Sequence, residues 1–82
     1  MSVSYDRPND GTESCNTATV TNQLLEPLPD GRVRFVLPAG KYDISGGRLE
    51  SEIVSDNGRF HVLTVRVDIP ANDSTTIKVD SL

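Results

Sequence analysis

From residue 17 onward, apolar and polar residues alternate in short runs, and Pro or Gly separates one run from the next. Side chains on one face of a strand recur at every second position, whereas the apolar face of a helix recurs about every 3.6 residues. The helical period does not occur after residue 16. The chain is therefore predicted to fold from strands alone, and its fold class is all-β.

Seven segments have the composition and the alternation that are typical of strands. They are Val3 to Tyr5, Thr17 to Thr21, Arg32 to Leu37, Lys41 to Ile44, Arg48 to Val54, Arg59 to Ile69 and Ser74 to Val79. A small antiparallel β-sandwich of about six to seven strands accommodates them, and a small β-barrel is the alternative. Residues 1–16 are polar, so we expect a flexible polar arm followed by a single domain over residues 17–82.

Turn residues predict how the strands connect. The sequence Asp56-Asn57-Gly58 favours a type I′ turn and a hairpin between the flanking strands. Pro29-Asp30-Gly31 predicts a turn before the strand that begins at Arg32. The segment Pro70-Ala71-Asn72-Asp73 is interpreted as the connection between the last two strands, which we expect to pair with each other.

The alternation also assigns one face of each strand to the core. The expected core residues are Val33, Phe35, Leu37, Tyr42, Ile44, Leu49, Ile53, Leu63, Val65, Val67, Ile69, Ile77 and Val79. Phe60 and Val62 fall on the face opposite Leu63, which predicts a bulge after Val62 or a stretch covered on both faces. Because only 35% of the 82 residues are hydrophobic, this core is thin, and packing against another domain or subunit would stabilise it.

Charge and apolar content argue against several classes of protein. The net charge is -4 and the basic residues are spread along the chain, whereas a nucleic-acid surface needs a basic stripe with interleaved aromatic residues. We therefore expect no nucleic-acid partner. The sequence has no apolar run long enough for a membrane span and no signal-peptide pattern at its amino terminus. Cys15 is the single cysteine, so no intrachain disulfide is expected.

Glu50 and Glu52 are the first candidates for chemistry. Residues two apart on a strand project from the same face with Cα atoms about 6.6 Å apart, a spacing compatible with the carboxyl pair of a glycosidase. A catalytic acid also needs an apolar pocket that raises its pKa, and this face looks solvated. We therefore interpret the two residues as a surface charge ladder with Arg34 or Arg66 as cross-strand partners.

Other candidate sites have simpler interpretations. Cys15 and His61 are the only possible Cys-His pair, but Cys15 lies in the polar arm and one residue of each type is too few for a zinc site. The segment Asp6 to Glu13 collects oxygen donors but lacks the calcium-loop spacing. Gly46-Gly47 is followed by a strand, so it does not form a phosphate loop. We expect no catalytic residues, no cofactor and no metal.

Sugar binding is a weaker hypothesis. Carbohydrate modules present exposed aromatic rings, and this chain has no Trp. With Phe35 and Tyr42 assigned to the core, only Tyr5 and Phe60 remain for such a platform. Asn72-Asp73-Ser74 formally matches an N-glycosylation acceptor, but these residue types are also typical of turns.

The second half of the chain, from Tyr42 to Val79, resembles the C-terminal β-sandwich domain of bacterial α-L-rhamnosidases and, more broadly, bacterial immunoglobulin-like modules. The residues that carry the resemblance are Gly47, Arg48, Leu49, Ser51, Glu52, Gly58, Phe60, Ile69, Pro70, Ala71 and Asn72. The sequence departs from the rhamnosidase pattern at Ile53, where an aromatic residue is usual, and in the segment from Val33 to Ile44. Catalysis does not occur in that domain of the rhamnosidases, so the resemblance implies a chain without enzymatic activity.

Two functions are consistent with these observations. The first is a noncatalytic accessory or spacer module of a secreted or surface bacterial protein that acts on carbohydrate, with a neighbouring domain or protein as its partner. The alternative is a stand-alone small binding protein, such as an inhibitor or a self-assembling surface or phage decoration protein, which the initial Met and the short length favour. Homo-oligomers are compatible with both, and the expected location is extracellular or at the cell surface.

Overall fold

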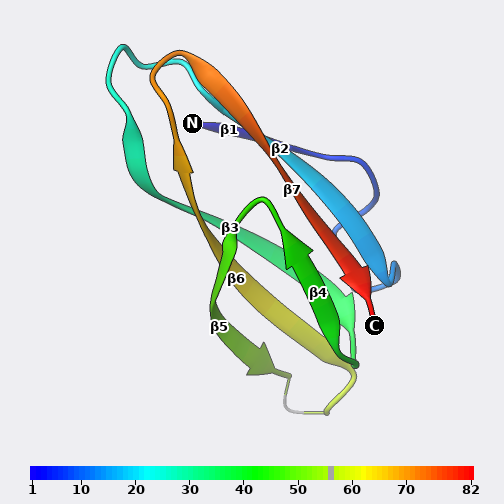
Figure 1. The fold of residues 1–82 in the computed structure, drawn as a ribbon. Coiled ribbons are helices and arrows are strands. Elements are labelled where there is room, and N and C mark those ends of the chain that lie inside the picture. The colour runs from blue at the N-terminus through cyan, green and yellow to red at the C-terminus, as the bar shows by residue number, and fades with distance from the viewer. Residues whose placement is uncertain (56) are drawn as a thin grey trace.

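The computed structural model describes residues 1–55 and 57–82, which form seven strands in two antiparallel sheets (Figure 1). The four-stranded sheet contains, in spatial order, β1 (Ser2–Tyr5), β2 (Cys15–Asn22), β7 (Asp73–Ser81) and β4 (Tyr42–Ser45). The three-stranded sheet contains β3 (Leu28–Pro38), β6 (Phe60–Ile69) and β5 (Arg48–Val54) in that order. The sheets do not close into a barrel, and the predicted small antiparallel β-sandwich is confirmed.

The strand order differs from that of an immunoglobulin constant domain. Both folds divide seven strands into sheets of four and three. In the immunoglobulin order, the fifth strand lies beside the second and the seventh pairs with the sixth. Here β7 lies beside β2 and β5 pairs with β6, so the fifth and seventh strands have exchanged sheets.

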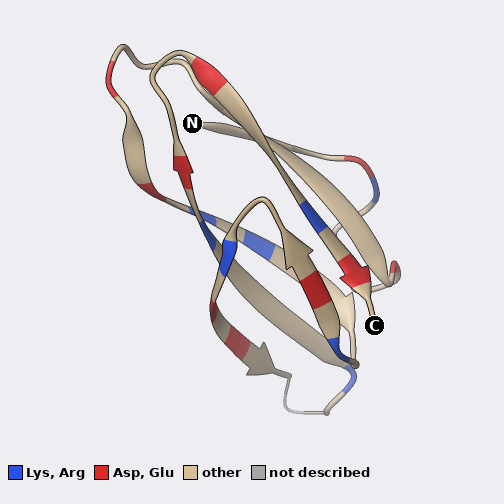
Figure 2. Ribbon diagram, viewed as in Figure 1, with Lys and Arg blue, Asp and Glu red and all other residues tan. Residues whose placement is uncertain are grey.

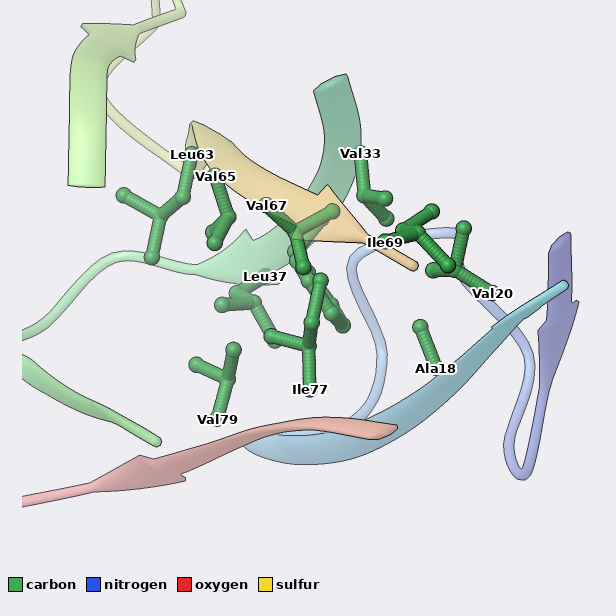
Figure 3. Close-up of a cluster of buried hydrophobic side chains, with 11 residues drawn as sticks. Ala18, Val20, Val33, Leu37, Leu63, Val65, Val67, Ile69, Ile77 and Val79 are labelled. Carbon is green, nitrogen blue, oxygen red and sulfur yellow. The ribbon is translucent and has the colours of Figure 1, made fainter. Parts of the chain in front are cut away.

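The core lies between the two sheets (Figure 3). Its buried apolar residues are Ala18, Val20, Val33, Phe35, Leu37, Leu63, Val65, Val67, Ile69, Ile77 and Val79. The predicted inward faces of β3, β6 and β7 are therefore confirmed. Tyr42 and Ile44 of β4 are half-buried and pack against this core, as Val3 and Tyr5 of β1 do.

Residues 1–16 contribute to the sandwich. β1 pairs with β2, and β2 already begins at Cys15, so the domain boundary predicted at residue 17 falls inside a strand. The turn after β1 follows the free edge of β3. The Asn9 side chain donates to the Arg34 carbonyl and accepts from the Val36 amide, and the Gly11 amide donates to the Val36 carbonyl. The flexibility of this segment stays a prediction.

The predicted pairing of the last two strands is wrong. β6 pairs with β3 and β5, whereas β7 pairs with β2 and β4. The segment Pro70-Ala71-Asn72 therefore carries the chain from one sheet to the other and does not close a hairpin. The Asn72 amide donates to the Leu24 carbonyl, which ties this crossing to the loop after β2.

Two other local predictions are corrected. Pro29 and Asp30 form a bulge inside β3, between Leu28 and Gly31, and not a turn before it. The pairing of β6 with β3 runs without a break past Val62 and Leu63, so the first predicted alternative, a bulge, is absent. Phe60 and Val62 are half-buried on the face opposite buried Leu63, so this stretch is partly covered on both faces, as the second alternative expected.

The hairpin between β5 and β6 is confirmed, and its Gly58 has a φ of 69°. The predicted type I′ turn includes Asp56, which lies outside the described residues.

β5 is exposed along its whole length, contrary to the predicted burial of Leu49 and Ile53. A bulge lies between Leu49 and Ser51, where Glu50 is the extra residue. Since side chains alternate across a sheet, one extra residue moves every later side chain to the opposite face. Leu49, which precedes the bulge, lies opposite buried Val65. Ile53, which follows the bulge, lies opposite Val62 on the outer face.

Candidate functional site

The two candidate carboxylates lie on opposite faces of β5. Glu52 is the cross-strand neighbour of buried Leu63 and therefore projects from the inner face, whereas the bulge directs Glu50 outward. Glu50 accepts hydrogen bonds from the Arg32 guanidinium at 2.7 and 3.1 Å. These bonds hold the pKa of Glu50 below its ordinary value. The shared face expected for a glycosidase-like pair is therefore not formed. Arg32 is the hydrogen-bonded partner of Glu50 in place of the predicted Arg34, and the charge of the predicted partner Arg66 also lowers the pKa of Glu50.

Three arginines lie in one cross-strand row on the outer face of the three-stranded sheet (Figure 2). Arg66 lies directly opposite both Arg32 and Arg48, and like charges in this position destabilise a sheet. Asp30 forms an ion pair with Arg66, and Glu50 forms one with Arg32. The two carboxylates thus neutralise two of the three arginine charges. We therefore attribute the alignment of the arginines to the pairing of the strands and not to an anion-binding site.

Cys15 and His61 lie in different sheets. Cys15 starts β2 and is the neighbour of Asp80, whereas His61 lies on β6 between Leu37 and Val54. His61 Nδ1 is 2.6 Å from Glu52 Oε1, so the imidazole faces a carboxylate and not the thiol. The structure does not bring the two residues together as a nucleophile pair.

Four oxygen-bearing side chains of the segment from Asp6 to Glu13 form hydrogen bonds or ion pairs within their own segment or with β3, and they are Asn9, Asp10, Thr12 and Glu13. The Asp10 carboxylate accepts hydrogen bonds from the amide and the hydroxyl of Thr12, and these bonds lower its pKa. Glu13 pairs with Arg7 at 3.4 Å. Within the described residues there is no group of three or more His, Cys, Asp or Glu side chains that could hold a metal ion.

Both glycines between β4 and β5 have packing roles. Gly46 has a φ of 84°, and a Cβ there would lie less than 3.0 Å from the Thr76 carbonyl oxygen. A Cβ at Gly47 would lie 2.6 Å from Val65 Cγ1. The pair allows the chain to pass between the sheets, close to β6 and β7.

Asn22, at the end of β2, organises one end of the sandwich. Its side chain is buried, with 1% of the residue exposed. The amide nitrogen donates to the carbonyls of Glu26, Ile69 and Pro70 at 2.9, 3.4 and 3.2 Å, and the Oδ1 atom accepts from the Leu24 amide at 3.0 Å. One side chain therefore holds both the loop after β2 and the crossing from β6 to β7.

Asn16 has the equivalent position near the other end of β2. It is 4% exposed, accepts from the amides of Arg7 and Thr17, and donates to the Arg7 carbonyl. Sequence reasoning missed both asparagines. The available signal was their phase, because Asn16, Ala18, Val20 and Asn22 alternate on one face of a strand.

Asn22→Ala is expected to lower the free energy of unfolding by about 2–3 kcal/mol, because it leaves buried backbone carbonyls without a donor. Asn22→Asp should be at least as harmful, since a carboxylate would face those same carbonyls. Urea denaturation followed by circular dichroism measures both effects. A Gln23→Ala variant, altered at the neighbouring residue and at an exposed side chain, is the control, and equal losses in all three variants would contradict the assigned role of Asn22.

The two aromatic residues considered for sugar binding are engaged in packing. The Tyr5 ring meets Phe35 edge to face, with centroids 5.7 Å apart and planes at 87°, and its hydroxyl donates to the Arg34 carbonyl. The Phe60 ring lies over Gly11, where a Cβ would clash with it. Both residues are half-buried. Neither ring lies open as a flat platform on which a sugar could stack.

Exposed apolar residues gather at the end of the sandwich that Asn22 organises. This apolar end consists of half-buried Leu28 together with exposed Leu24, Leu25, Pro27, Pro29 and Pro70. Leu25 is 90% exposed and Leu24 is 55% exposed. An open hollow of about 430 Å³ at this end is lined by residues 27–29 and 68–70. Exposed apolar surface of this kind commonly marks contact with another protein.

Comparison with known proteins adds no relative to this description. No family model, curated protein or solved structure matches the chain. In the described part of the chain, no helix is long and apolar enough to cross a membrane.

Proposed function

We propose that this chain is a noncatalytic accessory or spacer module of a longer secreted or surface bacterial protein. The observation that carries the proposal is the position of the two chain ends. β1 starts beside Thr21, near the apolar end, whereas β7 finishes beside Tyr42, towards the opposite end. The chain therefore enters an elongated sandwich near one end and leaves it near the other (Figure 1).

Strand pairing at both ends supports a spacer role. Ser2 is already paired with Thr21, and the Leu82 amide still donates to the Lys41 carbonyl. The backbone is therefore ordered by hydrogen bonds at both Ser2 and Leu82. The module measures 42 × 21 × 19 Å, so it would hold two neighbours apart along its long axis.

The carbohydrate part of the proposal rests on the resemblance of the second half to the rhamnosidase β-sandwich domain. In this proposal the parent protein acts on carbohydrate and the module itself does not bind it. The packing of Tyr5 and Phe60 supports this division, since both rings are half-buried and in contact with their own chain.

The size of the native polypeptide tests the spacer function. Antibodies raised against the folded domain are used on immunoblots of the producing cells, separated into cytoplasm, envelope and medium. The expected result is a band well above 8.9 kDa in the envelope or the medium. A band at 8.9 kDa alone would contradict the proposal, whatever fraction contains it.

The stand-alone binding protein is the second candidate, and the apolar end favours it. Leu24 and Leu25 expose apolar side chains to water, and this exposure does not stabilise a monomer. The same immunoblots separate the two functions, because a stand-alone binding protein would run at 8.9 kDa after denaturation. Before denaturation, the binding protein would elute from a sizing column together with a larger partner.

A further inference from the structure

Three carboxylates around the apolar end lack a cationic partner. The ion pairs of the described chain engage five other carboxylates, those of Glu13, Asp30, Glu50, Glu52 and Asp80. Glu26, Asp68 and Asp73 are exposed and take part in none of these pairs. Residues 17–31 and 67–77, which include this end, contain no Lys or Arg (Figure 2). The apolar end therefore carries negative charge that the described chain does not neutralise.

The hollow at this end combines apolar walls with one carboxylate. Of the described residues that line it, three are prolines and only Asp68 is charged. Asn22 donates hydrogen bonds to the carbonyls of Glu26 and Pro70, so it fixes the two chain segments that form the walls. Proline rings also restrict the backbone. The hollow is thus formed before any ligand arrives, and binding there costs little conformational entropy.

A Lys or Arg side chain has the chemistry that this hollow requires. Both side chains have an aliphatic stem that packs on apolar surface and a cationic head that stays polar. The stem fits against the proline rings, and the head can pair with the Asp68 carboxylate. Leu24 and Leu25, exposed in the loop that leads to Pro27, offer apolar contacts to the residues beside that cation.

Charge disfavours the other occupants of the apolar end. A symmetric contact with a second copy would bring the same unpaired carboxylates of both chains together, and like charges across an interface repel. Anionic lipid headgroups would be repelled in the same way. An uncharged apolar segment would take Asp68 out of water without a partner, and burying an unpaired charge is costly. A cation beside apolar residues avoids all three penalties.

We propose that the apolar end binds a basic segment of a partner protein in which apolar residues flank a Lys or Arg. That Lys or Arg enters the hollow and pairs with Asp68, and its apolar neighbours cover Leu24 and Leu25. Glu26 and Asp73 attract any further positive charge of the segment. The docking site is independent of the proposed spacer function, because all of its residues belong to one chain.

Selection from a phage library of random short peptides tests the chemistry of the partner. The folded, unmodified chain is the immobilised target. The recovered peptides should be enriched in Lys or Arg flanked by Leu, Ile, Val or Phe, because only this combination satisfies both the walls of the hollow and Asp68. Recovery of no binding peptide, or of peptides without this enrichment, would overturn the proposal.

Matched variants of the chain then separate the docking site from general attraction to an acidic protein. Asp68→Asn keeps the shape of an exposed side chain and should weaken binding of a recovered peptide at least about tenfold. Asp43→Asn, at an exposed carboxylate of β4 that also lies outside the ion pairs, should bind like the unmodified chain. Fluorescence anisotropy of the labelled peptide measures both affinities. Equal affinities of the two variants would contradict the proposal.

Nuclear magnetic resonance locates the bound peptide. Titration of the isotope-labelled chain with a recovered peptide should shift the amide resonances of residues 24–29 and 68–73, and shifts centred on β4 or β5 would contradict the proposal. Raising the concentration of the chain alone should leave these resonances unchanged. Concentration-dependent shifts at Leu24 and Leu25 would instead identify a second copy as the occupant and overturn the proposal.

Discussion

Ile77→Ala is expected to leave the domain largely unfolded at room temperature. The Ile77 side chain is fully buried, and two of its neighbours are small: Ala18 is its partner on β2, and Gly47 lies against it. Small neighbours cannot move in to fill the cavity, so the loss should fall within the range of about 2–5 kcal/mol for such truncations. A domain of this size has only about 5 kcal/mol of stability. Thermal and urea unfolding followed by circular dichroism measure the loss.

Glu50→Gln and Glu52→Gln are the controls for this prediction. Each removes a charge from exposed β5 without removing volume, so both unfolding midpoints should stay close to that of the unmodified chain. A silent Ile77→Ala variant together with a severe effect of either Gln variant would mean that the faces of β5 and β7 are reversed.

Strand positions and inward faces were predictable because both follow from local alternation. Val33, Phe35 and Leu37 repeat at every second position, and so do Ile77 and Val79. The structure buries all five. This pattern depends only on neighbouring residues along the chain, so it can be recognised without knowing which strands pair.

The partner of each strand was less accessible to sequence reasoning. The short connection between Ile69 and Asp73 has the length and composition of a hairpin loop, and adjacent strands usually pair. The deciding contacts come from elsewhere: Asn22 binds the carbonyls of Ile69 and Pro70, and Leu24 accepts from the Asn72 amide. Contacts between segments so far apart in the sequence leave no mark in the local pattern.

The bulge at Glu50 has a similar explanation. Leu49, Ser51 and Ile53 alternate without interruption, so the sequence predicts one apolar face. The structure inserts Glu50 as an extra residue opposite β6, and Leu49 and Ile53 then project from opposite faces. The same bulge separates Glu50 from Glu52, so the candidate carboxyl pair and the face of β5 were mispredicted for one reason.

Gly46→Ala is the other substitution with a large expected effect. Gly46 has a φ of 84°, a conformation that costs an L-residue about 1–2 kcal/mol. The added Cβ would also lie less than 3.0 Å from the Thr76 carbonyl oxygen, and backbone cannot rotate away as a side chain can. The overlap should add about 1–3 kcal/mol, since β7 must shift. The expected total loss, about 2–5 kcal/mol, approaches the whole stability of the domain.

Gly58→Ala separates the two contributions. Gly58 also has a positive φ, 69°, but a Cβ there meets no atom of the described residues within 4 Å. It should therefore lose only the conformational part, about 1–2 kcal/mol, and the difference between the two variants in urea denaturation measures the overlap with Thr76. Equal losses of unfolding free energy would mean that the β7 backbone shifts at no energetic cost. In that case, the close approach between β7 and the turn after β4 would not help to hold the two sheets together.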